Sequence, residues 1–189
     1  MFFSRQRKRN DEELIGLVVK GDERAMTELY QRYSRQMLRY FYRMLWKEET
    51  LAQDFLQDLF IKVIENAHRF KTDKKFSTWL YSIAHNMCKN EYRKRAFRQA
   101  VQSGTWQEVS EDTTHQRFEA KEFQRALDKA LETLDEEDKH LFLLRHETEI
   151  PLEEIAQILE CPVGTVKSRL FYIRKKLAAK LYSYHPVNE

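Results

Sequence analysis

Side chains suited to DNA contacts recur along residues 163–177. In a helix, where each residue turns by about 100°, one side would carry hydroxyl, aromatic and basic groups: Ser168, Phe171, Tyr172 and Lys175, flanked by Lys167, Arg169 and Arg174. Arginine and lysine donate to guanine edges or phosphates, serine contacts either, and an aromatic edge can meet a thymine methyl group. A basic face alone is also typical of a solvated helix, so its meaning depends on the elements that present it.

The apolar spacing of residues 152–177 predicts two consecutive helices that would present this face. The first has one apolar stripe: Leu152, Ile155, Ala156 and Leu159. Cys161 and Pro162 interrupt it, and proline is tolerated at the first position of a new helix. The second helix would bury a Val/Leu/Ile side: Val163, Val166, Leu170, Ile173 and Leu177. The pair fits a helix-turn-helix that reads the major groove.

A second stretch with binding potential is FSTWLYSIAHNMCKNEYRKR, at residues 76–95. Its buried side is predicted to be Phe76, Leu80, Ile83 and Met87, and one border carries Trp79, Ser82, Asn86 and Arg93, with Lys89 nearby. A tryptophan alone is more often a core residue. Beside Asn86 and the basic run at 93–95, however, it fits proteins that hold single nucleic-acid strands with aromatic surfaces, polar groups and cations.

A third stretch, residues 50–70, is apolar beyond one helical stripe. The stripe comprises Ala52, Phe55, Leu56, Leu59 and Val63, whereas Phe60, Ile61 and Ile64 fall outside it. Such a helix either packs on two sides or offers a surface to a partner. The polar neighbours of the extra apolar residues are Gln53, Asp54, Gln57 and Asp58.

Composition favours an all-α protein with two helical domains. The 189 residues include only 4 glycines and 3 prolines, with 33% charged residues. We expect an N-terminal domain at residues 1–97, a flexible linker at 98–119 and a C-terminal domain at 120–189 of winged-helix-like, helix-turn-helix type. The net charge of +3 hides separate basic clusters, which fit local nucleic-acid contacts better than bulk binding.

Individual helices can also be placed. We expect a helix at residues 11–20 that ends at Gly21, followed by a long helix capped by Asp22. The C-terminal domain should begin with a helix near Ala120 and a second one capped by Asp135. Its predicted core includes Phe123, Ala126, Leu127, Ala130, Leu134, Leu141 and Leu144. His140 and His146 are expected at or near the surface.

Catalytic and metal-binding patterns are lacking in the sequence. Its glycines stand alone, its 6 histidines are dispersed, and Cys88 and Cys161 are far apart without a histidine pattern. We therefore expect no enzyme activity, cofactor, metal site or disulfide. The basic N-terminus lacks the apolar segment of a secretory signal, and no run of about 18 apolar residues could span a bilayer. These features predict a cytoplasmic protein without direct membrane insertion.

Three segments together resemble a known family: LAQDFLQDLFIKV, FSTWLYSIAHNMCKN and IPLEEIAQILECPVGTVKSRLFYIRKKL. They are similar to the sigma factors of bacterial RNA polymerase, specifically the extracytoplasmic-function (ECF) group of the sigma-70 family. The likeness covers residues 11–181, with the motifs in the expected order. A helix-turn-helix alone would be weak evidence because response regulators share it, but the combination of all three segments is specific.

The resemblance implies a promoter-specificity subunit with sigma region 2 in the N-terminal domain and region 4 in the C-terminal domain. The first would bind the beta-prime clamp helices through Gln53, Asp54, Gln57, Asp58 and Ile61. It would capture melted minus-ten DNA through Asn86, supported by the loop at residues 69–75 and by Lys74, Trp79, Lys89, Asn90 and Arg93. The second would touch the beta flap and read duplex minus-thirty-five DNA through Arg145, Thr165, Lys167, Ser168, Arg169, Phe171, Arg174 and Lys175.

Two departures from the family pattern stand out. The family usually has an acidic residue where Gln53 stands, and the turn at residues 71–75 is lysine-rich, which either tunes DNA affinity or is simply solvated. With no long acidic leader before Asp11 and no extra domain after Leu181, we expect the chain to resemble the minimal members of the family. Such members are commonly held inactive by a membrane-linked anti-sigma factor.

Two other functions remain open at this point. A stand-alone helix-turn-helix regulator would use the C-terminal helix pair for DNA and the N-terminal helices for dimerisation, without core polymerase. A DNA-processing enzyme with a helix-turn-helix targeting module is disfavoured because metal-binding carboxylate geometry is missing.

Overall fold

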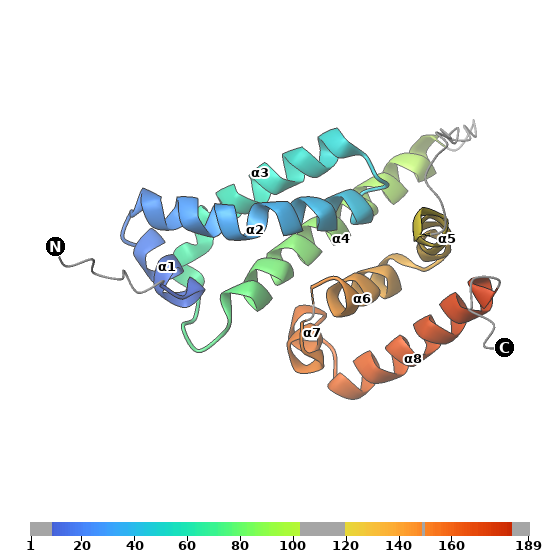
Figure 1. The fold of residues 1–189 in the computed structure, drawn as a ribbon. Coiled ribbons are helices and arrows are strands. Elements are labelled where there is room, and N and C mark those ends of the chain that lie inside the picture. Colours follow the sequence, from blue (N-terminus) through green and yellow to red (C-terminus); the bar gives the residue numbers. More distant parts are fainter. Residues whose placement is uncertain (1–8, 103–119, 149, 183–189) are drawn as a thin grey trace. The chain divides into compact units, whose positions relative to one another are not determined.

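The computed structural model describes residues 9–102, 120–148 and 150–182. These residues form helices and contain no β-strand, which confirms the all-α prediction (Figure 1). The chain divides into two compact units, and each is described by itself. The predicted linker falls mainly on residues outside the described ranges, so the domain boundaries stay a prediction. No helix in the described ranges is both long and apolar enough to cross a membrane.

The N-terminal unit contains α1 (Asp11–Val18), α2 (Glu23–Met44), α3 (Glu49–Asn66), a short 3-10 helix η1 (Ala67–Arg69) and the first half of α4 (Phe76–Gln102), because the boundary between the units falls after Cys88. The long α2 lies alongside both α1 and α3 (Figure 1). Gly21 adopts a left-handed φ of 83° in the turn before α2. As predicted, Asp22 caps α2 by accepting hydrogen bonds from the N–H groups of Arg24 and Ala25 at 2.9 and 3.1 Å.

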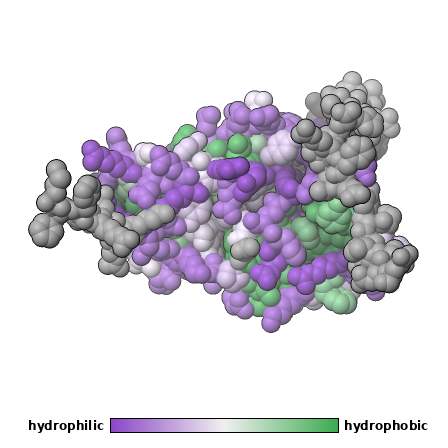
Figure 2. All heavy atoms as spheres, viewed as in Figure 1, coloured by the Kyte–Doolittle hydropathy of each residue, from purple (hydrophilic) through white to green (hydrophobic). Residues whose placement is uncertain are grey.

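Apolar and aromatic side chains fill the core of this unit. The largest fully buried ones are Leu14, Ile15, Leu29, Met37, Phe41, Met44, Leu45, Leu59, Phe76, Leu80 and Tyr81. Burying a side chain such as Leu or Phe contributes about 1.5–3 kcal/mol. Figure 2 shows mainly hydrophilic side chains over α1 and α2, as expected for helices whose apolar stripes are turned inward.

Both alternatives left open for the extra apolar residues of α3 are found in part. Phe60 is only 5% exposed, because its ring packs against Tyr30 of α2 with ring centroids 4.8 Å apart. The buried face of α3 is therefore wider than the single predicted stripe. Of the three apolar residues predicted to lie outside the stripe, only Ile61 and Ile64 are exposed. The next helix, α4, also extends beyond its predicted end and reaches Gln102.

The C-terminal unit contains α5 (Ala120–Glu132), α6 (Glu136–His146), α7 (Leu152–Ile158) and α8 (Val163–Lys180). Asp135 caps α6 by accepting from the Asp138 N–H at 2.8 Å, as predicted. The two apolar stripes of the helix-turn-helix are largely as predicted, with these buried residues: Ile155, Ala156, Val166, Leu170, Ile173 and Leu177. The other predicted members, Leu152, Leu159 and Val163, are half-buried.

The turn between α7 and α8 is sharp. Glu160 has a left-handed φ of 52°, and the Cys161 N–H donates to the Ala156 carbonyl at 3.0 Å. Pro162 is the N-cap of α8 rather than its first residue, one position from our prediction. Its carbonyl accepts from the Thr165 and Val166 N–H groups, so proline begins the helix without needing a donor of its own.

Two predictions for this unit were wrong. His140 is fully buried rather than near the surface, because it stands four residues before Leu144 and shares that residue's side of α6. Phe123 was expected in the core but is 43% exposed. The buried residues of this segment lie at the other end of α5 and just beyond it, at Ala130, Leu131 and Leu134.

Candidate nucleic-acid interfaces

The side of α8 opposite its buried stripe is exposed along three turns. Its exposed residues include every predicted DNA-contacting residue of this helix except Arg169: Thr165, Lys167, Ser168, Phe171, Arg174 and Lys175. Phe171 and the neighbouring Tyr172 are 63% and 67% exposed, with their rings edge to face at 5.5 Å. Two exposed aromatic rings among cations form a surface that can contact base edges and phosphates together.

Ser168 occupies the first half of this exposed face. Its Oγ donates to the Thr165 carbonyl at 3.0 Å, which holds the hydroxyl close to the helix. A hydroxyl oxygen that donates in this way keeps its acceptor lone pairs. Ser168 is therefore positioned to accept from a base edge without breaking its intramolecular bond.

Arg169 lies between the exposed face and the core, where it contacts the start of α6. Its Nε donates to Asp138 at 2.8 Å and its Nη1 donates to Glu137 at 3.0 Å, while its Nη2 lies 3.8 Å from Asp135. Burial lowers the pKa of Arg169, but the hydrogen bonds and charges of Asp138 and Glu137 outweigh it and raise the pKa above its ordinary value. The guanidinium thus joins two helices of the unit, and its predicted DNA contact stays a prediction.

Further basic groups gather where α6 ends. Arg145 is half-buried there, and the next residue, His146, stacks on Phe142 with ring centroids 4.4 Å apart. Burial lowers the pKa of His146, and the positive charges of Arg174 and Arg145 lower it further. Arg145 of α6 and Arg174 of α8 therefore both lie close enough to His146 for their charges to act on it. Our predicted set omitted His146, although its place directly after Arg145 was a usable signal.

The α4 helix carries a polar stripe on one side. Asn86, Lys89, Asn90 and Arg93 are all exposed and follow the three- and four-residue spacing of one helical face. Trp79 and Ser82 continue this side toward the start of the helix and are half-buried. The side chains predicted for strand capture on α4 therefore share one side of a single rigid element.

Trp79 belongs to a small aromatic cluster, which we define as Tyr33, Phe70, Phe76 and Trp79. The ring centroid of Trp79 lies 5.4 Å from that of Phe70 and 6.0 Å from that of Phe76. Packing holds one part of the indole, and its half-buried state leaves another part accessible. Lys74 is exposed in the turn before α4, where its N–H donates to the Lys71 carbonyl at 3.0 Å.

The α3 helix presents a third exposed face, on the side away from its buried stripe. All five residues predicted to bind polymerase are exposed: Gln53, Asp54, Gln57, Asp58 and Ile61. Ile61 and Ile64 are 52% and 54% exposed. Burying these apolar side chains against a partner would be the most favourable contact on this face, because it removes them from water.

Within the described residues, no group of three or more metal-ligating side chains is found.

Residues 29–98 match the family model described as Sigma-70 region 2, and residues 124–177 match the one described as Sigma-70, region 4. The ECF RNA polymerase sigma-E factor of Haemophilus influenzae is 30% identical over 182 residues, which are 90% of this chain and 95% of that protein. The chain belongs to the ECF group of sigma-70 factors. The resemblance of its three segments is thereby confirmed.

Other relatives of this sigma factor agree. The sigma-E factor of Escherichia coli K12 is 31% identical over 183 residues, 90% of this chain and 94% of that protein. The sigma-H factor of Pseudomonas aeruginosa is 30% identical over 178 residues, 88% of this chain and 91% of that protein.

Two solved structures share the fold of this sigma factor. RpoE of Bartonella quintana, in complex with the anti-sigma factor NepR, has a TM-score of 0.71 and 21% identity, covering 86% of this chain and 98% of that one. CnrH, in complex with the cytosolic domain of CnrY, has a TM-score of 0.68 and 24% identity, covering 92% and 97%.

Membership of the family establishes the general function. The sigma factor directs RNA polymerase in promoter recognition and is not an enzyme. The exposed faces of α3 and α4 fall within the region 2 match, and the helix-turn-helix falls within the region 4 match. By contrast, α1 precedes the residues that the region 2 model matches, and no motif assigned a function to its side chains.

Proposed function

We propose that this sigma factor binds core RNA polymerase through α3, captures the melted minus-ten strand with α4 and reads duplex minus-thirty-five DNA with α8. The observation that carries this proposal is the difference between the exposed faces of two helices, α4 and α8. The α4 face combines a half-buried tryptophan with amides and cations, whereas the α8 face combines a hydroxyl, two exposed aromatic rings and a row of cations.

Strand capture by α4 follows from its chemistry. Removing a base from the stack costs a few kcal/mol, so a protein must offset this cost with stacking and hydrogen bonds. The Asn86 amide can both donate to and accept from a base edge, and Trp79 supplies an aromatic surface about two turns away on the same side of the helix. Lys89, Arg93 and Lys74 would then neutralise the phosphates of the captured strand.

Duplex reading by α8 follows from a different set of groups. Lys167 and Arg174 can donate to guanine edges or phosphates, and Phe171 can meet a thymine methyl group. Arg145, at the end of α6, would contact a phosphate beside the helix-turn-helix. Arg169 is paired with carboxylates of its own unit. We therefore expect its main role to be holding α8 in position, with contact to DNA as a secondary role.

Polymerase binding would use the α3 face, with Ile61 and Ile64 buried against the beta-prime clamp and the amides and carboxylates surrounding them. Region 4 would contact the beta flap. We further propose that an anti-sigma factor holds this protein inactive in the cytoplasm, by analogy with the relatives solved in complex with NepR and CnrY.

Purified components test this function directly. A cognate promoter is first identified by sequencing the transcripts that overexpression induces. Core polymerase with the sigma factor should bind that promoter and produce a run-off transcript, and core alone should not. Failure to bind core would overturn the proposal. Tight promoter binding by the protein alone, unchanged by core, would instead support a stand-alone regulator.

A further inference from the structure

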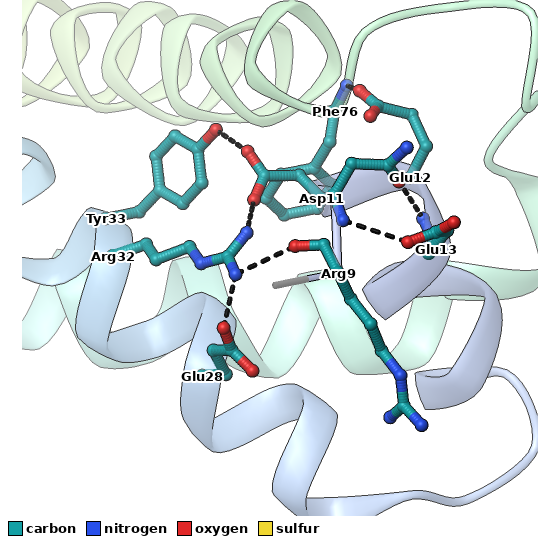
Figure 3. A network of polar contacts seen from close by, with 9 residues as sticks. Arg9, Asp11, Glu12, Glu13, Glu28, Arg32, Tyr33 and Phe76 are labelled. Carbon is teal, nitrogen blue, oxygen red and sulfur yellow. Dashed lines mark hydrogen bonds and ion pairs between the residues drawn. The ribbon is translucent and has the colours of Figure 1, made fainter. Parts of the chain in front are cut away.

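The start of α1 is fixed to α2 by a polar network (Figure 3). Asp11 accepts hydrogen bonds from the Arg32 guanidinium and from the Tyr33 hydroxyl. Arg32 also pairs with Glu28 and donates to the Arg9 carbonyl at 2.9 Å. Burial and the hydrogen bond to Asp11 both raise the pKa of Tyr33, so its hydroxyl stays protonated as the donor. These contacts hold the first turn of α1 at a defined place on α2.

The next residue, Glu12, reaches a different helix. Its carboxylate accepts a hydrogen bond at 2.9 Å from the backbone N–H of Phe76, which lies 64 residues away in the chain (Figure 3). Phe76 is the first residue of α4. The N–H groups at a helix start have no partner within the helix, and a negative charge there is favourable. Glu12 thus acts as an N-terminal cap supplied by another helix.

The capped residue is also the centre of the aromatic cluster. The Phe76 side chain is fully buried, with its ring centroid 5.3 Å from Tyr33, 6.2 Å from Phe70 and 6.0 Å from Trp79. Trp79 lies one turn into the helix, and its N–H donates to the Lys75 carbonyl at 3.3 Å. The position of Phe76 therefore determines both where Trp79 lies and where the lysine-bearing turn at 71–75 ends.

We propose that Glu12 is a positioning residue for capture of the melted minus-ten strand. Through the Phe76 N–H it holds the first turn of α4, and through Phe76 it holds Trp79 and the adjoining turn. The inference rests on the proposed role of α4 in strand capture. It gives α1, which precedes the family-matched residues, a function in promoter opening without a DNA contact of its own.

Three variants separate positioning from general stability. Glu12→Ala removes the acceptor, Glu12→Gln keeps an acceptor oxygen without the charge, and Glu12→Asp keeps the charge with a shorter reach. Glu13→Ala is the matched control. Glu13 is the next residue of α1 and completes the capping box with Asn10 at 2.7 and 3.0 Å, but this pairing is local to the start of α1. Both alanine variants thus remove one capping carboxylate that α1 carries, but that of Glu12 caps α4 and that of Glu13 caps α1 itself.

The experiment measures how holoenzymes reconstituted with each variant bind a fluorescent single-stranded oligonucleotide of the minus-ten non-template sequence. We expect Glu12→Ala to weaken binding about three- to tenfold, Glu12→Gln to restore most of it, and Glu13→Ala to match the wild type. Core affinity should be equal in all of them, which also shows that the variants are folded. If Glu12→Ala does not fold, Glu12→Asp should show the same loss in weaker form.

Asn86→Ala serves as the reference for strand capture. If it weakens oligonucleotide binding while Glu12→Ala and Glu12→Asp do not, the positioning role is overturned and the role of α4 stands. Equal losses in Glu12→Ala and Glu13→Ala would also overturn it, because they indicate a general effect of destabilising α1. If Asn86→Ala and Glu12→Ala both bind normally, the proposed role of α4 fails, and this inference fails with it.

Discussion

Arg169 of α8 donates from its Nε to Asp138 of α6 at 2.8 Å, which ties α8 to the first turn of its neighbour. Glu137 accepts from the same guanidinium at 3.0 Å. A second tie lies further along α8, where Lys176 Nζ donates to the Thr133 carbonyl at 3.0 Å. Two basic residues of α8 therefore hold the helix in place while its other basic residues remain exposed.

Replacing Arg169 should lower the stability of the protein more than it changes the preference for particular bases. We expect Arg169→Ala to lower the free energy of unfolding by about 1–2 kcal/mol, because charged hydrogen bonds in a half-buried site are lost. Urea unfolding measures this loss. A double-mutant cycle with Asp138→Ala should show coupling between the two residues, whereas Lys167→Ala, at an exposed position on the same helix, should change stability little. Fully additive losses would contradict the tie.

Replacing Ser168 should change which minus-thirty-five sequences are preferred. If its hydroxyl contacts a base edge, Ser168→Ala loses about 1–3 kcal/mol of discrimination at one base pair. Holoenzyme binding to a panel of single-base promoter variants measures this effect. Lys175→Ala provides the contrast, since loss of a phosphate contact weakens all sequences alike and lowers the salt dependence. Uniform weakening by Ser168→Ala would show that this residue does not read bases.

Replacing Ile61 should impair assembly with polymerase. Ile61→Glu places a charge where we expect a buried apolar contact, and it should weaken core binding by about tenfold or more. Val19→Glu is the matched control, because Val19 is equally exposed at 52% but lies on the α1–α2 connection. Core affinity measured with fluorescently labelled variants tests the difference. Equal effects of the two substitutions would remove α3 from the interface.

His146 should make the C-terminal unit less stable in acid. Its pKa is lowered from 6.5 by burial and by Arg174 and Arg145, so the folded state favours the neutral ring. Between the lowered pKa and 6.5 the unfolded chain binds more protons, and the free energy of unfolding therefore falls as pH falls through this window. His146→Gln should flatten that dependence in urea unfolding between about pH 7.5 and about pH 5.5. An unchanged pH dependence would contradict this electrostatic coupling.

Local patterns predicted the helices and their buried stripes because each depends on residues close in sequence. The stripe of α8, the caps at Asp22 and Asp135 and the exposed face around Ser168 follow from helical spacing alone. The burial of His140 was predicted wrongly, and that of Phe60 was left open, because both depend on what packs beside the predicted stripe.

The cap from Glu12 to Phe76 and the pairing of Arg169 with α6 could not be predicted either. They join residues 64 and 31 positions apart, and no periodicity connects such partners. The family motifs named Arg169 for its position on the DNA-binding helix, whereas the structure shows what else its guanidinium contacts. Whether the residues of the three exposed faces contact polymerase and DNA stays a prediction.

The division of labour between α4 and α8 is tested most directly by footprinting one promoter with holoenzymes that carry Asn86→Ala. Permanganate reports unpaired thymines in the minus-ten element, and nuclease protection reports occupancy of the minus-thirty-five element in the same complexes. Our account predicts that permanganate reactivity is largely lost while minus-thirty-five protection remains. Normal reactivity, or loss of both signals together with unchanged core binding, would contradict it.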